Sequence, residues 1–176
     1  MPARRTVPRK SARKKSPVKP TGRSLLRHTV ATLAYRGGKA LRGAPADFAE
    51  FRMGDSTRAP GQILAHIGDL LDWALSKANG AVKWHNSSPL PWDKGSDRFF
   101  AALEALDARL ASQKPLGCTP EDLFQGPIAD ALTHVGQLCM LRRLAGSPVR
   151  GENYSKAKIE AGRVGPDQLP PGFEFD

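Results

Sequence analysis

Two residues that can bind a metal ion or carry a proton lie one helical turn apart near the end of the chain. Asp130 and His134 stand in a segment that is otherwise rich in leucine. At 100° per residue, side chains four positions apart share one side of a helix, and Gln137 follows on the same side. A carboxylate among apolar side chains needs a partner, because burying an unpaired charge is costly.

A second histidine, His66, lies at the edge of the apolar face of another expected helix. If the two helices are neighbours, His66 meets Asp130 and His134. Two imidazoles and one carboxylate then form a three-ligand set with open positions, which suits a divalent transition metal (zinc, nickel, iron or manganese) and water. The same residues also fit a plainer interpretation, in which the histidines belong to the core and Asp130 simply pairs with His134.

Nearby residues receive smaller roles. Gln137 either orients a metal ligand or packs between helices as an ordinary amide, and the sequence supports both equally. Asp69 is expected to be a solvated charge, and Trp73 to be a core residue. Trp84 and His85 fall in an expected loop that could cover a pocket, although a loop histidine is more often a surface residue.

The two cysteines, Cys118 and Cys139, are too few for a disulfide framework, so a reducing compartment is expected. Cys139 lies on the opposite helix face from Asp130 and His134, which argues against a ligand role. A polar group at residues 150–154 follows the last helix. We expect it to hold the C-terminal segment in place rather than to close over a substrate.

Four helices are expected to position these residues. Apolar side chains recur at helical spacing in four segments, which are residues 24–41, 60–79, 96–112 and 127–145. No segment alternates with a period of two, so no strand is expected. The sequence therefore predicts an all-α protein built as a four-helix bundle.

Capping residues set the expected helix ends. Ser24 is expected to cap the first helix, and Pro60 to begin the second. Asn79-Gly80 is a usual terminator. Thr119-Pro120 signals another helix start, but Gly126-Pro127 is expected to interrupt it before the main last helix. A short helix is expected near residues 155–161.

Two stretches resemble the motifs of DinB-like metal-binding proteins. Residues 57–73, with the pattern Ile-Leu-Ala-His66, are similar to the second helix of that family, where the histidine is a metal ligand. Asp130-Ala-Leu-Thr-His134-Val-Gly-Gln137 is similar to the family's last-helix motif, His-x-x-x-His-Arg-Gly-Gln. The resemblance covers about residues 24–150 and implies a DinB-like four-helix bundle.

Carried over residue by residue, the resemblance implies that His66 and His134 are metal ligands. Asp130 stands where the family usually has histidine, and Val135 where arginine is common. An aspartate still offers an oxygen ligand and gives the site a harder character, or it marks a branch that binds metal weakly. The resemblance also implies a metal-dependent hydrolase or thiol-dependent transferase of unspecified substrate, a stress-response setting and a homodimer.

The positive charge is concentrated at the N-terminus. The chain has 27 Lys and Arg against 17 Asp and Glu, and nine of the basic residues lie in residues 1–23, which contain no acid. We therefore expect a disordered basic tail over residues 1–22, a bundle over 23–150 and a C-terminal extension over 151–176 that packs on the bundle. The tail predicts at most weak, non-specific nucleic-acid contact by counterion release.

Two function classes remain open from the sequence. One is the metal-dependent enzyme, and the other is a non-catalytic bundle for binding or dimerisation with a nucleic-acid-tethering tail. No stretch approaches the roughly 18–20 apolar residues of a membrane span. The basic N-terminus lacks the apolar run of a secretory signal, so a cytoplasmic location is expected.

Overall fold

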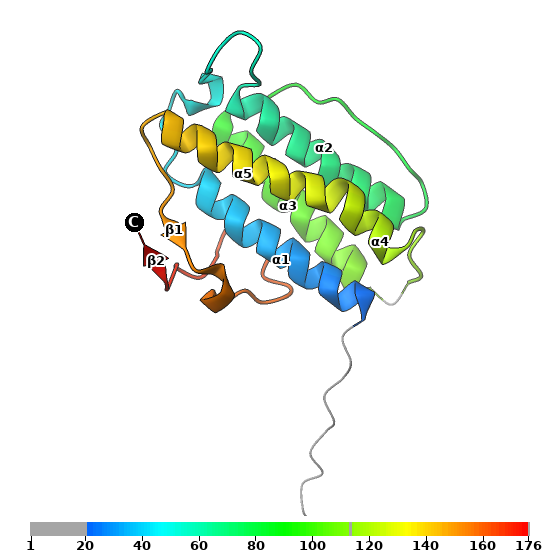
Figure 1. The fold of residues 1–176 in the computed structure, drawn as a ribbon. Helices are drawn as coiled ribbons and strands as arrows, with labels where there is room; N and C mark the ends of the chain where they lie inside the picture. Colours follow the sequence, from blue (N-terminus) through cyan, green and yellow to red (C-terminus); the bar gives the residue numbers. More distant parts are fainter. Residues whose placement is uncertain (1–20, 113, 176) are drawn as a thin grey trace, which may run out of the picture.

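The computed structural model describes residues 21–112 and 114–175, and this part of the chain is mostly helical. Figure 1 shows four long helices, which are α1 (Gly22–Leu41), α2 (Pro60–Ala78), α3 (Trp92–Ala111) and α5 (Ala129–Leu144). The predicted basic tail, residues 1–22, lies outside the described residues except at Thr21 and Gly22, which are the N-cap and the first residue of α1. No helix of the described part is both long and apolar enough to cross a membrane.

Helix α1 begins two residues before the predicted cap. Thr21 is the N-cap, and its hydroxyl accepts a hydrogen bond from the backbone of Ser24 at 3.1 Å. The Ser24 hydroxyl lies 2.8 Å from the Thr21 backbone nitrogen and completes the capping box. Ser24 therefore takes part in the cap as the third residue of the helix. The prediction that Ser24 is the N-cap itself was wrong, because Thr21 occupies that position.

Helix α2 starts at Pro60, as predicted, and ends before Asn79-Gly80. Gly80 has a φ of +74°, which favours glycine and terminates the helix. Helix α3 starts at Trp92, four residues before the predicted Ser96, because Pro91 already leads the chain into the helix. Asp93 and Lys94, which resemble part of a loop in the sequence, are exposed residues of the first turn of α3.

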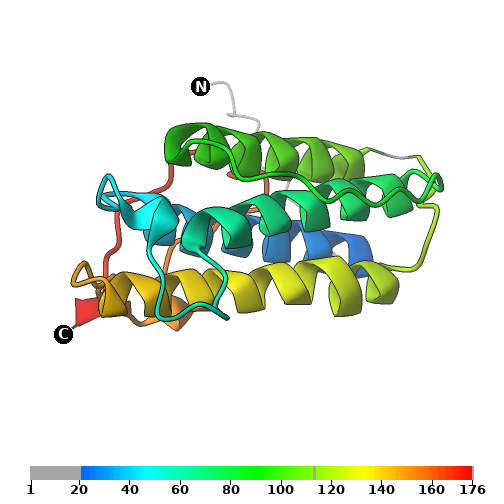
Figure 2. The same cartoon turned by 90° about the horizontal axis from the view of Figure 1, so that it is seen from above.

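The order of the helices requires one long crossing segment. Helices α2 and α3 run in the same direction, so residues 79–91 return along the length of α2 before α3 begins (Figure 2). The parallel arrangement is visible in two contacts. Arg98 donates to the Ala65 carbonyl near the start of both helices, and Arg109 donates to Asn79 near their ends. We call residues 79–91 the crossover segment.

The last helical stretch is continuous where an interruption was expected. Helix α4 (Pro120–Leu123) passes through a π-helical segment, η2 (Phe124–Ile128), directly into α5. Pro127 lies inside this wide turn and supplies no N–H, and the π-helical geometry accommodates the lost hydrogen bond without breaking the helix. The predicted break is therefore a local widening, three residues before Asp130.

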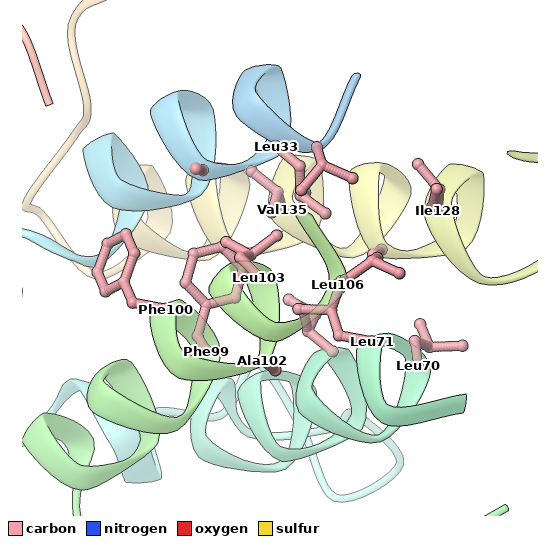
Figure 3. Packing of buried hydrophobic residues seen from close by; sticks show 14 of the residues in the cluster. Leu33, Leu70, Leu71, Phe99, Phe100, Ala102, Leu103, Leu106, Ile128 and Val135 are labelled. Carbon is pink, nitrogen blue, oxygen red and sulfur yellow. The ribbon is translucent and has the colours of Figure 1, made fainter. Parts of the chain in front are cut away.

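The core lies between the four long helices. The side chains of Leu33 from α1, Leu71 from α2, Leu103 and Leu106 from α3, and Val135 from α5 point toward one another (Figure 3), and each residue is at most 3 % exposed. Helix α1 comes close to α3 at Gly37, where an added Cβ would lie 2.4 Å from the Phe99 ring. The missing side chain of this glycine lets Phe99 pack directly against the backbone of α1.

The C-terminal segment is held on the outside of α1. Strand β1 (Gly151–Glu152) pairs antiparallel with β2 (Glu174–Phe175), and 3-10 turns lie at η1 (Phe48–Glu50) and η3 (Tyr154–Lys156). No strand had been predicted, since two residues are too short to show alternation. The helix expected at residues 155–161 is only the η3 turn.

Buried charges join this segment to α1. Glu152 is 6 % exposed and accepts hydrogen bonds from the Tyr35 hydroxyl at 2.7 Å and from Lys39 at 2.9 Å. Lys39 also forms an ion pair with Glu174 at 2.7 Å. Of the two interpretations of residues 150–154, the contacts made by Glu152 support the one in which they hold the C-terminal segment.

Candidate metal centre

Helices α2 and α5 bring the three predicted ligands together. His66 lies in the middle of α2, and Asp130 and His134 lie one turn apart in the first half of α5, which packs beside α2 (Figure 1). The Asp130 carboxylate is 3.4 Å from Nε2 of His134 and 3.8 Å from Nε2 of His66. One ligand atom from each residue lies within 4.8 Å of the other two.

These separations suit a small metal ion. Two ligands of a tetrahedral zinc ion lie about 3.3 Å apart, given bonds of about 2.0–2.1 Å. The two histidine–carboxylate distances are near that value, so a small inward movement of the side chains would form the set. Two nitrogens and one oxygen are a donor set of intermediate hardness, which fits zinc, nickel, iron or manganese. The residues present therefore fit the predicted cofactor.

The site is buried on one side and open on the other. The His134 side chain is 11 % exposed, that of His66 is 23 % exposed and that of Asp130 is 49 % exposed. The expectation of a buried carboxylate was wrong, because Asp130 lies at the solvent edge of α5. Its exposure lowers the cost of the charge and leaves access for water or a substrate on that side.

The two imidazoles meet edge to face. Their ring centroids are 4.8 Å apart and the planes are nearly perpendicular, at 87°. Burial lowers the pKa of His66, and the neighbouring His134 and the charge of Arg58 lower it further, against the opposing charges of Asp130 and Asp69. His66 is consequently neutral at pH 7, which is the form that binds a metal ion.

Gln137 sets the orientation of His134. The Nδ1 atom of His134 lies 2.8 Å from Oε1 of Gln137, one turn further along α5. An amide oxygen can only accept, so Nδ1 carries the proton and Nε2 keeps its lone pair facing Asp130. Of the two roles that the sequence left open for Gln137, this contact favours ligand orientation.

One tryptophan lies beside His66, and a second tryptophan packs against the first. Trp84, from the crossover segment, has its ring centroid 5.7 Å from His66 and 5.7 Å from Trp73 of α2. Trp73 is partly buried and packs against the core, as expected, yet it also supports Trp84. The neighbouring His85 lies instead in a separate pocket with Asp72 and Ser87, and so is not part of the metal centre.

The crossover segment is bound to α2 by hydrogen bonds to Asp69, an aspartate that was predicted from the sequence to be a solvated charge. Asp69 is 2 % exposed, not solvated. Its carboxylate accepts hydrogen bonds from the backbone and hydroxyl of Ser87, at 2.9 and 2.7 Å, and from Arg98 at 2.7 Å. The error arose because helical periodicity shows only the face of α2 that packs on other helices and not the face that the crossover segment covers.

A pocket lies beside His134. It has a volume of about 380 Å³, and its lining residues are Thr57, Arg58, Ile63, His134, Gln137, Met140 and Leu141. Sequence reasoning did not single out Arg58. Its position just before α2, the helix that carries His66, is the one signal that could have indicated it.

Comparison with protein-family models, with curated proteins and with solved structures gives no match to this chain. The class that the fold and site define is therefore a mostly helical protein with a His-Asp-His group between two helices. Within the described residues, the structure brings three side chains that can ligate a metal ion into one group, and these are His66, Asp130 and His134.

Proposed function

We propose that the protein is a metal-dependent enzyme whose divalent transition metal is held by His66, Asp130 and His134, on a four-helix bundle of the DinB-like kind. The observation that carries the proposal is the convergence of these three side chains from α2 and α5, with ligand atoms within 4.8 Å. The motif resemblance of residues 57–73 and 130–137 supports the same assignment.

A bound divalent ion would lower the pKa of a coordinated water or thiol and so supply a nucleophile near neutral pH, as a hydrolase or thiol-dependent transferase needs. The chain's own residues provide the setting. Gln137 fixes the ring of His134, and the exposed side of Asp130 leaves room for the reacting group. Trp84 shields His66 from solvent on the side of the crossover segment.

The test is metal content. Protein purified without an affinity tag is analysed for transition metals and then titrated with zinc, nickel, iron and manganese at neutral pH. We expect about one equivalent in the wild type and none in the His66→Ala/His134→Ala double variant, because a single remaining carboxylate binds such ions weakly. His28→Ala removes an exposed histidine of α1 and serves as the matched control.

Circular dichroism of each variant separates loss of the site from loss of the fold. A wild-type protein that takes up none of the four metals would overturn the proposal. The Asp130–His134 contact would then be an ordinary helix pair, and the non-catalytic binding protein would be the better description. One equivalent of metal lost in the double variant but kept in His28→Ala supports it and directs substrate screening to hydrolysis and thiol transfer.

A further inference from the structure

The pocket beside His134 has one charged group and a largely apolar wall. Ile63 and Leu141 are buried at 4 % and 7 % exposure, and Met140 at the mouth is 57 % exposed. Its volume of about 380 Å³ lies within the range of ~300–1,000 Å³ that is usual for small-ligand sites. An exposed methionine over a buried aliphatic floor suits an apolar ligand body, since thioethers adapt to irregular shapes.

Arg58 is the cation of this pocket. Within the part of the chain that the structure describes, its guanidinium forms no hydrogen bond or ion pair. Most other arginines of the helical core are engaged, as Arg98 is with Asp69 and Asp72. A guanidinium that lines a pocket without an acidic partner is suited to pair with an anionic ligand, and its planar fork matches a carboxylate.

The neighbouring polar groups narrow the choice of anion. The Thr57 hydroxyl already donates to the Gly54 carbonyl at 2.8 Å. Gln137 uses its oxygen on His134 and leaves its NH₂ group as a donor on the same wall. One guanidinium and one amide suffice for a singly charged carboxylate, whereas a phosphate dianion usually needs several charged or backbone donors.

We propose that this pocket binds a small carboxylate with an apolar body, and that Arg58 is the residue that pairs with the carboxylate. The inference rests on the proposed metal centre, since it places the substrate's body next to His134. With a divalent ion, two neutral imidazoles and the Asp130 carboxylate, the centre has a net charge of +1. Arg58 raises the local charge to +2, which favours an anion over a neutral substrate.

The experiment titrates a matched pair of probes, 4-phenylbutyrate and the neutral 4-phenylbutyramide, into zinc-loaded and zinc-free protein by calorimetry. The variants are Arg58→Gln, which removes the charge, and Arg58→Lys, which keeps it. Arg143→Gln removes an exposed arginine of α5 that does not line the pocket, and so controls for net charge. Met140→Asp places an opposing carboxylate at the mouth of the pocket.

We expect 4-phenylbutyrate to bind the wild type more tightly than the amide does, and to bind Arg58→Gln roughly five- to tenfold more weakly. Arg58→Lys should recover part of the loss, Arg143→Gln should bind as the wild type does, and Met140→Asp should abolish binding. Arg58→Gln should still bind one equivalent of zinc, which shows that the metal centre is intact.

Other outcomes separate the two proposals. If zinc binds but the two probes bind equally, or Arg58→Gln has no effect because the carboxylate binds the metal itself, the pairing role of Arg58 is overturned and the metal centre stands. If neither zinc nor nickel, iron or manganese binds, the metal proposal fails. Binding of 4-phenylbutyrate to zinc-free protein that depends on Arg58 would then still support the carboxylate pocket, and its absence would overturn both.

Discussion

Gln137 fixes the orientation of His134, the proposed metal ligand, because its Oε1 atom lies 2.8 Å from Nδ1 and accepts the Nδ1 proton in a hydrogen bond. Without that contact the imidazole can rotate and change tautomer. We expect Gln137→Ala to weaken zinc binding by about tenfold, the lower end of the usual cost of losing such an orienting partner. Competition with a chelator measures the affinity, and Gln125→Ala, an exposed glutamine of the same helical stretch, is the control.

An equal zinc affinity for Gln137→Ala and the wild type would show that packing alone holds the ring. A Gln137→Glu variant refines the same test. Its carboxylate can accept the same proton and makes the imidazole more basic, so we expect it to retain or strengthen zinc binding. Loss of binding in both variants would instead indicate that the amide NH₂ group matters.

At the scale of elements, the crossover segment depends on Asp69. Burial by itself would raise the pKa of Asp69, but hydrogen bonds from Ser87 and Arg98 outweigh it and leave the pKa below its ordinary value of 3.8. The folded state therefore binds this proton less readily than the unfolded state. The stabilisation is complete above about pH 5 and is lost as the pH falls through the lowered pKa of the folded protein.

We expect Asp69→Asn to reduce the free energy of unfolding by about 1–3 kcal/mol at pH 7, because Arg98 loses one of its two carboxylate partners and keeps only Asp72. The variant should also lose less stability than the wild type between pH 5 and pH 2.5. Denaturant titrations over this range measure both effects. Asp97→Asn, whose side chain is 73 % exposed on α3, should match the wild type. Parallel pH profiles for wild type and Asp69→Asn would contradict the assignment.

A buried arginine joins the ends of α1 and α5. Arg142 is 5 % exposed, and its guanidinium donates hydrogen bonds to the carbonyls of Ala40, Arg42 and Gly43 at the C-terminal end of α1. It also donates to the backbone carbonyl and the hydroxyl of Ser147, just after α5. These carbonyls have no helical partner, so the guanidinium satisfies them. The next residue along the chain, Arg143, is exposed.

This pair offers a test in which position alone differs. We expect Arg142→Ala to lower the free energy of unfolding by about 2–4 kcal/mol, since several buried carbonyls lose their donor. Arg143→Ala should change it by less than about 0.5 kcal/mol, as is usual for surface positions. Urea denaturation of both variants measures the difference, and similar values for the two would rule out the capping role of Arg142.

Across the whole molecule, the sequence predicted those features that the periodic spacing of apolar residues in a helix can indicate. The helical class and the limits of α2 followed from apolar spacing, because an amphipathic helix buries one stripe. The meeting of His66 with Asp130 and His134 was predicted only on the condition that their two helices are neighbours, which spacing alone does not establish. The roles of Asp69 and Arg58 did not follow. Both depend on which surface a distant segment covers, and single-sequence patterns carry no record of that. The π-helical turn at Pro127 was likewise predicted to be a break in the helix, since a proline is compatible with a helix end and with a widened turn.

The C-terminal segment packs on the outside of α1, and the buried Glu152 is its main polar contact with that helix. Its side chain is fully buried between Tyr35 and Lys39, and burial together with the hydrogen bond to Glu152 raises the pKa of Tyr35. Glu152→Gln keeps the shape but removes the charge facing Lys39, which then relies on Glu174 alone. We expect the free energy of unfolding to fall by about 1–3 kcal/mol, below the ~3–5 kcal/mol of a fully broken buried pair.

Limited proteolysis gives the second measurement, because a loosened segment is cut before the helical core unfolds. We expect Glu152→Gln to be cleaved faster than the wild type between residues 150 and 175, with the α1–α5 core resistant. Glu160→Gln, an exposed glutamate of the same segment, should be cleaved at the wild-type rate. If Glu152→Gln is as resistant as Glu160→Gln, the segment is held by its apolar contacts, among them the buried Val164, rather than by this charge.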